Sequence, residues 1–263
     1  MNQRWRDHQS SSRPAGEPIR TADYEVARID DDTTAKGFVI FHHYSSTYPA
    51  ARERFGLYRH GALVGVAIFS QPSNNATLAI FPGTPTESYE LGRFVLLDDV
   101  PGNGETWFIA RCFEQLRTLG ALGVVSFSDP FPRATEGGRR VFPGHVGTIY
   151  QASNAVYLGR ARAEKLLLLP DATTLHRRTL AKIVAREKGS HYAAEKLVAH
   201  GASPLRDDED PRAWLDTWLP KLTRSVQHPG NHKYAWILQR RHRRALPVSL
   251  PYPKLGREAA TAP

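Results

Sequence analysis

Residues 98–104, DDVPGNG, place two glycines between an apolar run and an amphipathic stretch. A glycine loop that opens a helix aims backbone N–H groups and the positive end of the helix dipole at one point, where an anion such as a phosphate can bind. Glycine suits such a loop because a side chain would block close approach and because left-handed backbone costs glycine little. The loop has neither a Walker motif nor the third glycine of a dinucleotide fingerprint. An anion cradle and a plain turn therefore both remain open.

Residues with acid–base chemistry occur in two other places. Asp129 ends the β-branched run GVVSFSD and precedes Pro130, and strand ends often line a cleft. His43 and Tyr44 stand in a polar stretch after the apolar run GFVIF. A neutral histidine can accept a proton or bind a metal, although no second ligand stands at a metal-binding spacing. The ordinary alternatives are a strand terminator for Asp129 and a packed loop pair for His43 and Tyr44.

The composition favours an acidic partner. The chain has 263 residues with a formal net charge of +9, and 27 arginines outnumber 8 lysines. Arginine favours planar, bidentate phosphate contacts, although a GC-rich genome would also enrich it. The single cysteine, Cys112, excludes an internal disulfide and indicates a reducing compartment such as the cytoplasm. We find no apolar run long enough for a membrane helix or signal peptide, so no membrane partner is expected.

The periodicity predicts an α/β protein. Strands are expected at 37–41, 54–59, 63–70, 77–81 and 88–98, and a helix from 105 to a stop at Gly120. A strand at 123–128, a short helix within 146–159 and a strand at 164–169 follow. Residues 173–200 read as two helices broken at Gly189, 210–226 as a third, and 233–239 as a last strand. The first 36 residues, rich in Ser, Pro, Arg and Asp, read as a flexible tail.

The order of these elements resembles the GNAT superfamily of N-acetyltransferases. In that superfamily the motif Gln/Arg-x-x-Gly-x-Gly/Ala binds the pyrophosphate of acetyl-CoA; here both glycines are kept, and Asp99 stands at the first position. The resemblance implies a central mixed, mostly antiparallel sheet flanked by helices. It also implies a cofactor site for acetyl-CoA or a related coenzyme A derivative at Val100, Gly102, Asn103, Gly104 and Glu105.

A closer resemblance covers roughly residues 37–240. The segments HHYSSTYPAARERFGLYRHGALVGVAIFSQPSN, ELGRFVLLDDVPGNGETWF, SFSDP, PGHVGTIYQASNAVYLGR and HPGNHKYAW are similar to the phage Mom family of DNA-modification proteins. This implies an acyltransferase-like enzyme that gives the N6 amine of adenine a methylcarbamoyl-type adduct, which blocks host restriction. A metal ion is a possible further requirement. The resemblance also implies catalytic roles for His43, Tyr44 and Asp129.

The resemblance to the acetyltransferases also implies a tyrosine that protonates the departing thiolate, and Tyr150 and Tyr157 are the candidates. Their helical i, i+7 spacing is equally consistent with packing. We favour Tyr150 as catalytic and Tyr157 as core. Arg93, before the run FVLL, is expected to be structural unless it is exposed in the cleft.

Double-stranded DNA has to be bound if adenine is the acceptor, by arginines and by aromatic rings that stack an extruded base. The basic candidates are Arg133, Arg139, Arg140, Arg177 and Arg178. The expected organisation is a tail at 1–36, one catalytic domain at 37–240 with a helical lobe at about 173–227 before the last strand, and a basic tail at 241–263. Two alternatives stay open: an acetyl-CoA-dependent N-acetyltransferase of a protein or small-molecule amine, and a non-catalytic DNA-binding module.

Overall fold

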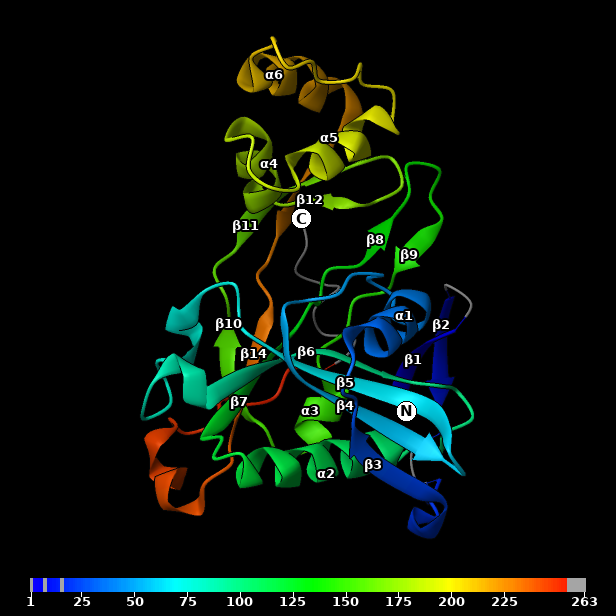
Figure 1. Ribbon diagram of the computed structural model, residues 1–263, viewed down its shortest axis with the longest axis vertical. Helices are drawn as coiled ribbons and strands as arrows, with labels where there is room; N and C mark the ends of the chain where they lie inside the picture. The colour runs from blue at the N-terminus through cyan, green and yellow to red at the C-terminus, as the bar shows by residue number, and fades with distance from the viewer. Residues whose placement is uncertain (1, 7–8, 15–16, 255–263) are drawn as a thin grey trace. The chain divides into compact units, whose positions relative to one another are not determined.

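The computed structural model describes residues 2–6, 9–14 and 17–254 (Figure 1). The chain divides into two compact units. Unit 1 comprises residues 1–130, 144–161 and 231–263, and unit 2 comprises residues 131–143 and 162–230. Unit 1 carries the glycine loop and every predicted catalytic residue.

Unit 1 is built on a seven-stranded sheet with the order β10-β14-β7-β6-β5-β4-β3. Its strands are β3 Tyr24–Arg28, β4 Ala51–Arg59, β5 Ala62–Ser70, β6 Ser88–Leu96, β7 Gly123–Ser128, β10 Val156–Arg160 and β14 His232–Ile237. All neighbours pair antiparallel except β6 and β7, which are parallel. The predicted fold class, a mostly antiparallel mixed sheet flanked by helices, is therefore confirmed.

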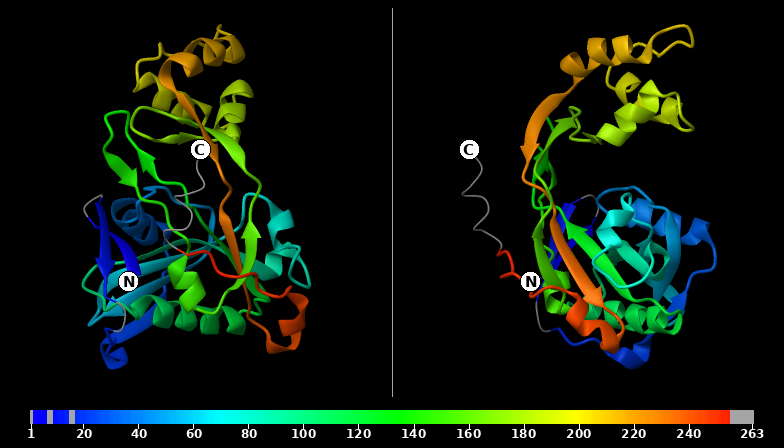
Figure 2. Two further views of the ribbon diagram at one scale, coloured as in Figure 1. Left: turned by 180° about the vertical axis from the view of Figure 1, so that it is seen from behind. Right: turned by 90° about the vertical axis from the view of Figure 1, so that its left-hand side faces the viewer.

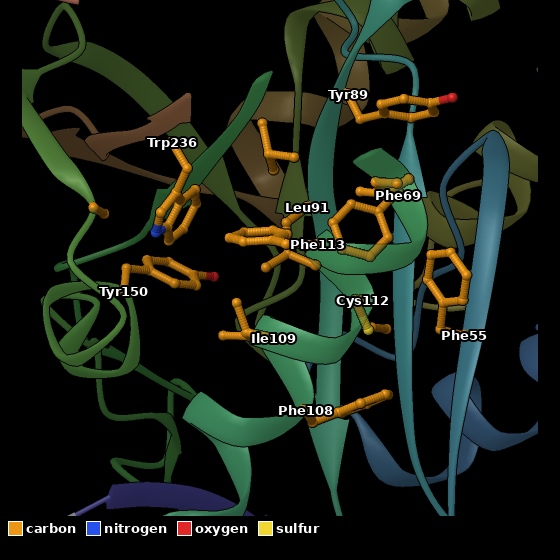
Figure 3. Close-up of a cluster of buried hydrophobic side chains, with 14 of the residues drawn as sticks. Phe55, Phe69, Tyr89, Leu91, Phe108, Ile109, Cys112, Phe113, Tyr150 and Trp236 are labelled. Atoms are coloured by element: carbon orange, nitrogen blue, oxygen red, sulfur yellow. The ribbon is translucent and has the colours of Figure 1, made fainter. Parts of the chain in front are cut away.

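The alternation of side chains along β5 separates two cores. Ala67 and Phe69 pack with the helix α2, Gly104–Thr118, in the largest cluster, which Figure 3 shows around Phe113 and Cys112. Val66 and Ile68 pack with α1, Asp32–His42. Successive strand residues point to opposite faces. The sheet thus carries α1 on one face and α2 on the other, as Figure 1 shows.

The end of the chain protects the edge strand β10. The Leu250 N–H donates to the Tyr157 carbonyl at 3.0 Å, and the Tyr157 N–H donates to Ser249 Oγ at 3.0 Å. The Tyr252 hydroxyl donates to the Ala155 carbonyl at 2.6 Å. Figure 2 shows this last segment, in red, running beside β10 and the short helix α3, Thr148–Ala152. Strand edges left open invite pairing with other chains, and these contacts cover this one.

Unit 2 combines short strands with three helices. A three-stranded sheet has the order β12-β11-β13, and β8 pairs with β9 as a hairpin. The helices form their own core around the fully buried Trp214, whose indole N–H donates to the Ser203 carbonyl at 3.0 Å. The bounds are β8 Arg133–Ala134, β9 Arg140–Phe142, β11 Glu164–Leu168, β12 Thr174–Leu175, β13 Arg224–His228, α4 Arg177–Val184, α5 Ser190–Val198 and α6 Pro211–Leu222. The helix break predicted at Gly189 lies between α4 and α5.

Three predicted elements are wrong. Residues 37–41 belong to helix α1, because Asp31 caps it by accepting the Thr34 N–H at 2.7 Å, and Ala35 and Val39, four residues apart, are its buried positions. Residues 77–81 hold the end of a 3-10 helix, Asn75–Leu78, and turns. The stretch 146–159 splits into α3 and strand β10.

The predicted N-terminal tail is too long. Residues 24–28 form β3, an edge strand of the sheet, and α1 begins at Asp32. The sequence of β3 has no clear strand pattern. None of its residues is fully buried, and only Tyr24 and Val26 pack against the core. The backbone of the earlier residues forms the hairpin of β1, Asn2–Arg6, and β2, Gln9–Arg13. The segment after residue 240 is likewise folded as far as its contacts with β10, and residues 255–263 lie outside the described range.

Within the described residues, no helix is long and apolar enough to cross a membrane.

Candidate active site

The glycine loop joins β6 directly to α2. Gly104 is the first residue of α2, and Asn103 is its N-cap. A Cβ on Gly104 would lie 2.5 Å from Val100 Cγ1, and one on Gly102 would lie 2.3 Å from the Pro14 carbonyl oxygen. Neither glycine has a positive φ. Glycine is therefore needed for close approach, while the expectation of left-handed backbone is not met.

The predicted cofactor residues fall into two groups. The side chains of Val100 and Glu105 are buried, so these positions could serve an anion only through their backbone. Gly102 and Asn103 are already in contact with the N-terminal segment. The Gly102 N–H donates to the Glu17 carboxylate at 3.0 Å, and Asn103 Oδ1 accepts the Ile19 N–H at 2.8 Å. The loop thus holds a carboxylate, which shows that its amides can bind an anionic oxygen.

Asp99, the residue that departs from the acetyltransferase motif, is paired. Its carboxylate lies 2.8 Å from an Arg59 guanidinium nitrogen of β4. An unpaired carboxylate beside the loop would repel a phosphate, and Arg59 offsets that charge. The acidic residue is thus compatible with an anion at the loop.

β6 and β7 pair over only three residues. The parallel register joins Ser88, Tyr89 and Glu90 to Gly123, Val124 and Val125 and ends there. Beyond this point the Leu91 carbonyl accepts a hydrogen bond from the side-chain hydroxyl of Ser126 in β7 at 2.9 Å, and no backbone pairing of the two strands continues. The strands therefore diverge at the level of Ser126.

β6 also has a bulge, which sets the direction of two charged side chains. The register with β5 shifts between Ile68 and Phe69, opposite Leu91 to Arg93. Leu91 and Phe94 both belong to the α2-side core although they are three residues apart. The extra residue leaves Glu90 and Arg93 together on the opposite face.

Arg93 is the centre of a polar cluster, called the buried cluster below, that also includes Tyr44, Glu90 and Tyr150. Its guanidinium donates to the Thr47 carbonyl at 2.9 Å, to the Thr47 hydroxyl and to the Gly92 carbonyl. Burial lowers its pKa, and the neighbouring Tyr44, Glu90 and Tyr150 raise it. Burial also raises the pKa of Glu90, and Arg93 lowers it. Arg93 is thus half-buried and ties the loop after α1 to β6.

The loop held by Arg93 carries the predicted pair His43 and Tyr44. Their rings stack with centroids 4.2 Å apart, and the Tyr44 hydroxyl lies 3.5 Å from His145 Nε2. The His43 Nδ1 accepts the Ser45 N–H at 3.1 Å, which places the proton of the neutral ring on Nε2. His43 is therefore better arranged to donate a hydrogen bond than to bind a metal through Nδ1.

Asp129 joins the same cluster through its backbone. It directly follows β7, and its carbonyl accepts the His145 N–H at 2.8 Å. His145 contacts the Tyr44 ring at 6.1 Å between centroids and adds to the charges that lower the pKa of His43. Asp129, Tyr44 and His43 are therefore brought together from two distant parts of the sequence.

Tyr150 lies beside Ser126, at the point where β6 and β7 diverge. Its ring packs on Tyr234 and edge-on to Trp236, and Figure 3 shows it at one end of the core cluster. Burial raises the pKa of its hydroxyl, which has a side-chain hydrogen bond with Ser126. Tyr157 instead contacts His232 Nδ1 at 2.7 Å in the buried core. The choice of Tyr150 over Tyr157 as the proton donor stays a prediction.

Gly147 fixes the position of Tyr150. It has φ +71° at the N-cap of α3, and a Cβ there would lie 2.8 Å from both the Tyr150 and Tyr234 rings. Only glycine meets both conditions without strain.

The burial of His43 predicts a pH dependence of stability. Burial, then Arg93, then His145 lower its pKa well below 6.5. As the pH falls below about 6.5, His43 binds a proton in the unfolded chain but stays neutral in the folded chain. The free energy of unfolding therefore falls by up to about 1.4 kcal/mol per pH unit. Urea unfolding at pH 7.5 and 5.5 should show a larger loss for the wild type than for His43→Gln. An equal loss in both proteins would contradict a neutral buried His43.

The predicted DNA-binding arginines all lie in unit 2. Arg139 and Arg140 are exposed beside the tip of the β8–β9 hairpin, and Arg133 packs over the Phe142 ring at 4.3 Å. Arg177 is exposed, whereas Arg178 is paired with Glu187 at 2.6 Å. Arg178 is therefore the weakest of these candidates.

A metal site is not evident. Within the described part of the chain, no group of three or more His, Cys, Asp or Glu residues could hold a metal ion.

Sequence reasoning missed three members of the cluster: Glu90, Ser126 and His145. Glu90 and Ser126 sit in strands that read as apolar, and only the bulge and the strand divergence give them their roles. His145 stands in the stretch PGH, and no residue near it in the sequence indicates a functional partner.

Comparisons with solved structures find N-acetyltransferases at low similarity. One from Staphylococcus aureus Mu50 has 10% identity and a TM-score of 0.37, covering 82% of this chain and 99% of its own. A tandem GNAT protein from the clavulanic acid biosynthesis pathway has 8% identity and a TM-score of 0.43, covering 82% and 99%. A spermidine N-acetyltransferase from Vibrio cholerae has 9% identity and a TM-score of 0.38, covering 85% and 98%.

The comparison with curated proteins finds no match. The comparison with family models matches residues 23–254, which include the glycine loop, the whole buried cluster and unit 2. The chain belongs to the Mom protein family.

Proposed function

We propose that this protein is a DNA-modification enzyme that transfers an acyl-type, methylcarbamoyl-like group from a coenzyme A derivative to the N6 amine of adenine. Modified phage DNA would then resist host restriction. The observation that supports the proposal is that, in a chain of the Mom family, His145 contacts both the Tyr44 hydroxyl and the Asp129 carbonyl, next to the predicted His43. Arg93 connects this cluster through its interactions with Tyr44 and Tyr150.

The glycine loop fits the pyrophosphate of such a cofactor. The Gly102 N–H already donates to a carboxylate, and Arg59 offsets the charge of Asp99. The diverging strands β6 and β7 lead from this loop towards Tyr150 and Ser126. A coenzyme A thioester held there would supply an activated carbonyl and a thiolate leaving group.

The residues of the cluster match the proton movements that adenine N6 requires. This amine is a poor nucleophile, so a group must take its proton during attack. Asp129, at the end of β7, is the proposed acceptor. The neutral His43 can donate from Nε2 to a developing oxyanion. Tyr150 carries its phenolic proton at neutral pH, as an ordinary tyrosine does, and it can give this proton to a leaving group.

The proposal assigns DNA binding to unit 2. The β8–β9 hairpin is held by two hydrogen bonds on its β8 side, since the Glu136 N–H donates to the Pro170 carbonyl at 2.8 Å and Arg224 donates to the Ala134 carbonyl at 2.7 Å. A hairpin anchored in this way and carrying exposed arginines is suited to phosphate contacts. Arg139 and Arg140 are therefore its proposed phosphate-binding residues.

Removing these arginines should change the salt dependence of DNA binding. Each lost phosphate contact lowers the slope of log K against log salt by about 0.9, so the double variant Arg139→Ala/Arg140→Ala should lose about 2. Fluorescence anisotropy with a duplex between 50 and 200 mM salt measures this slope. Arg178→Ala is the matched control, because Glu187 already neutralises that side chain. Equal slopes in the double variant and wild type would place the DNA contacts elsewhere.

The second candidate, acetylation of a protein or small-molecule amine, differs in its acceptor. Free thiol release from acetyl-CoA, used as the probe donor, should rise when duplex DNA is added and stay at its background with spermidine or lysine peptides. Release with the amines and not with DNA would favour the second candidate. A protein that binds DNA but never releases thiol would fit the third candidate, a binding module.

A further inference from the structure

We propose that the N-terminal segment is an autoinhibitory strap that occupies the anion cradle and must leave before the cofactor pyrophosphate can bind. The strap consists of Pro14, Glu17, Pro18 and Ile19 among the described residues. This inference rests on the proposed cofactor site and concerns its regulation.

Three contacts hold the strap on the glycine loop. The Glu17 carboxylate accepts the Gly102 N–H at 3.0 Å, and the Ile19 N–H donates to Asn103 Oδ1 at 2.8 Å. Pro14 approaches so closely that a Cβ on Gly102 would lie 2.3 Å from its carbonyl oxygen. The strap therefore covers the face of the loop that the two glycines leave bare.

The contact made by Glu17 is of the kind that a phosphate would make. Backbone N–H groups at a helix N-terminus favour any anionic oxygen, and a carboxylate oxygen and a phosphate oxygen compete for the same donor. Glu17 and Ile19 are only partly buried, and neither belongs to the hydrophobic core. The strap thus resembles a bound competitor more than a part of the fold.

The chain after the strap keeps it near the loop. A 3-10 helix, Thr21–Asp23, leads into β3, which pairs with β4 over five residues. A tether this short makes the contact intramolecular and gives Glu17 a high effective concentration at the cradle. Neutralising the carboxylate should therefore strengthen cofactor binding.

The experiment measures the Kd of coenzyme A for the full chain by titration calorimetry. Glu17→Ala should bind about tenfold more tightly than the wild type, which is the factor expected for one charge-assisted hydrogen bond. Glu25→Ala is the matched control, because Glu25 is an exposed carboxylate of β3 and its loss makes the same change in net charge. Its Kd should equal that of the wild type.

Each alternative outcome is distinct. Equal or weaker binding by Glu17→Ala, with measurable binding by the wild type, would overturn the strap and leave the cofactor site standing. Absence of binding in all three proteins would overturn the cofactor site and the strap together. Hydrogen exchange on the wild type gives a second test, because saturating coenzyme A should speed exchange of the Ile19 amide; slower or unchanged exchange would contradict displacement.

Discussion

Arg93→Leu should abolish modification activity and lower the free energy of unfolding by about 2–4 kcal/mol. The change removes the donors to Thr47 and Gly92 and leaves Glu90 half-buried without its neighbouring cation. It also releases the loop that carries His43 and Tyr44, whose placement depends on the Thr47 contacts. Urea unfolding and an activity assay on the same preparation measure the two effects.

Arg52→Leu is the control for the structural part of that loss. Arg52 of β4 is also half-buried, donates to the carbonyls of Thr86 and Ser88, and lies over the Tyr89 ring at 4.0 Å. Its loss should destabilise the protein by a similar amount and leave activity intact in the folded fraction. Full activity in folded Arg93→Leu would show that Arg93 has no part in the site.

Tyr150→Phe should lower kcat by about 10²–10³-fold and cost only about 1 kcal/mol of stability. The change removes one hydroxyl, which has its hydrogen bond with Ser126, and it keeps the ring packing against Tyr234 and Trp236. A phenol carries its proton at neutral pH and is proposed to give it to the leaving group, so its loss should affect the chemical step more than binding. Steady-state kinetics therefore should show the change in kcat rather than in KM.

Tyr157→Phe is the control for Tyr150→Phe, and it should change stability but not kcat. Its hydroxyl contacts the buried His232, so the variant should lose about 1 kcal/mol of stability and retain its kcat. If Tyr157→Phe lost activity and Tyr150→Phe kept it, the assignment of the proton donor would be reversed.

The sequence was sufficient where local pattern decides structure. The loop between β6 and α2, the two helices separated at Gly189 and the strand β7 ending before Asp129 are all found as expected. Each combines a clear hydrophobic period with a glycine or proline stop. The fold class and the family followed from their order and from long blocks of similar sequence.

Tertiary context decided the rest. The run GFVIF has strand composition, yet the Asp31 cap and the buried face of α1 make it helical. The alternation of β6 predicts Glu90 and Arg93 on opposite faces, and the bulge reverses this. Residues 1–36 were predicted to be a flexible tail because they lack hydrophobic periodicity, although Glu17 accepts a hydrogen bond from the glycine loop. The bulge and the Glu17 contact depend on residues distant in the chain, and the local Asp31 cap is outweighed in the sequence by the strand-like composition of GFVIF.

The central claim is that this protein modifies adenine in DNA. Mass spectrometry of nucleosides from DNA of cells that express it reports the acceptor and the transferred group together. We expect a new deoxyadenosine adduct with the wild type and a strongly reduced amount with Tyr150→Phe at equal protein level. Unmodified DNA in cells that contain folded wild-type protein would contradict the claim.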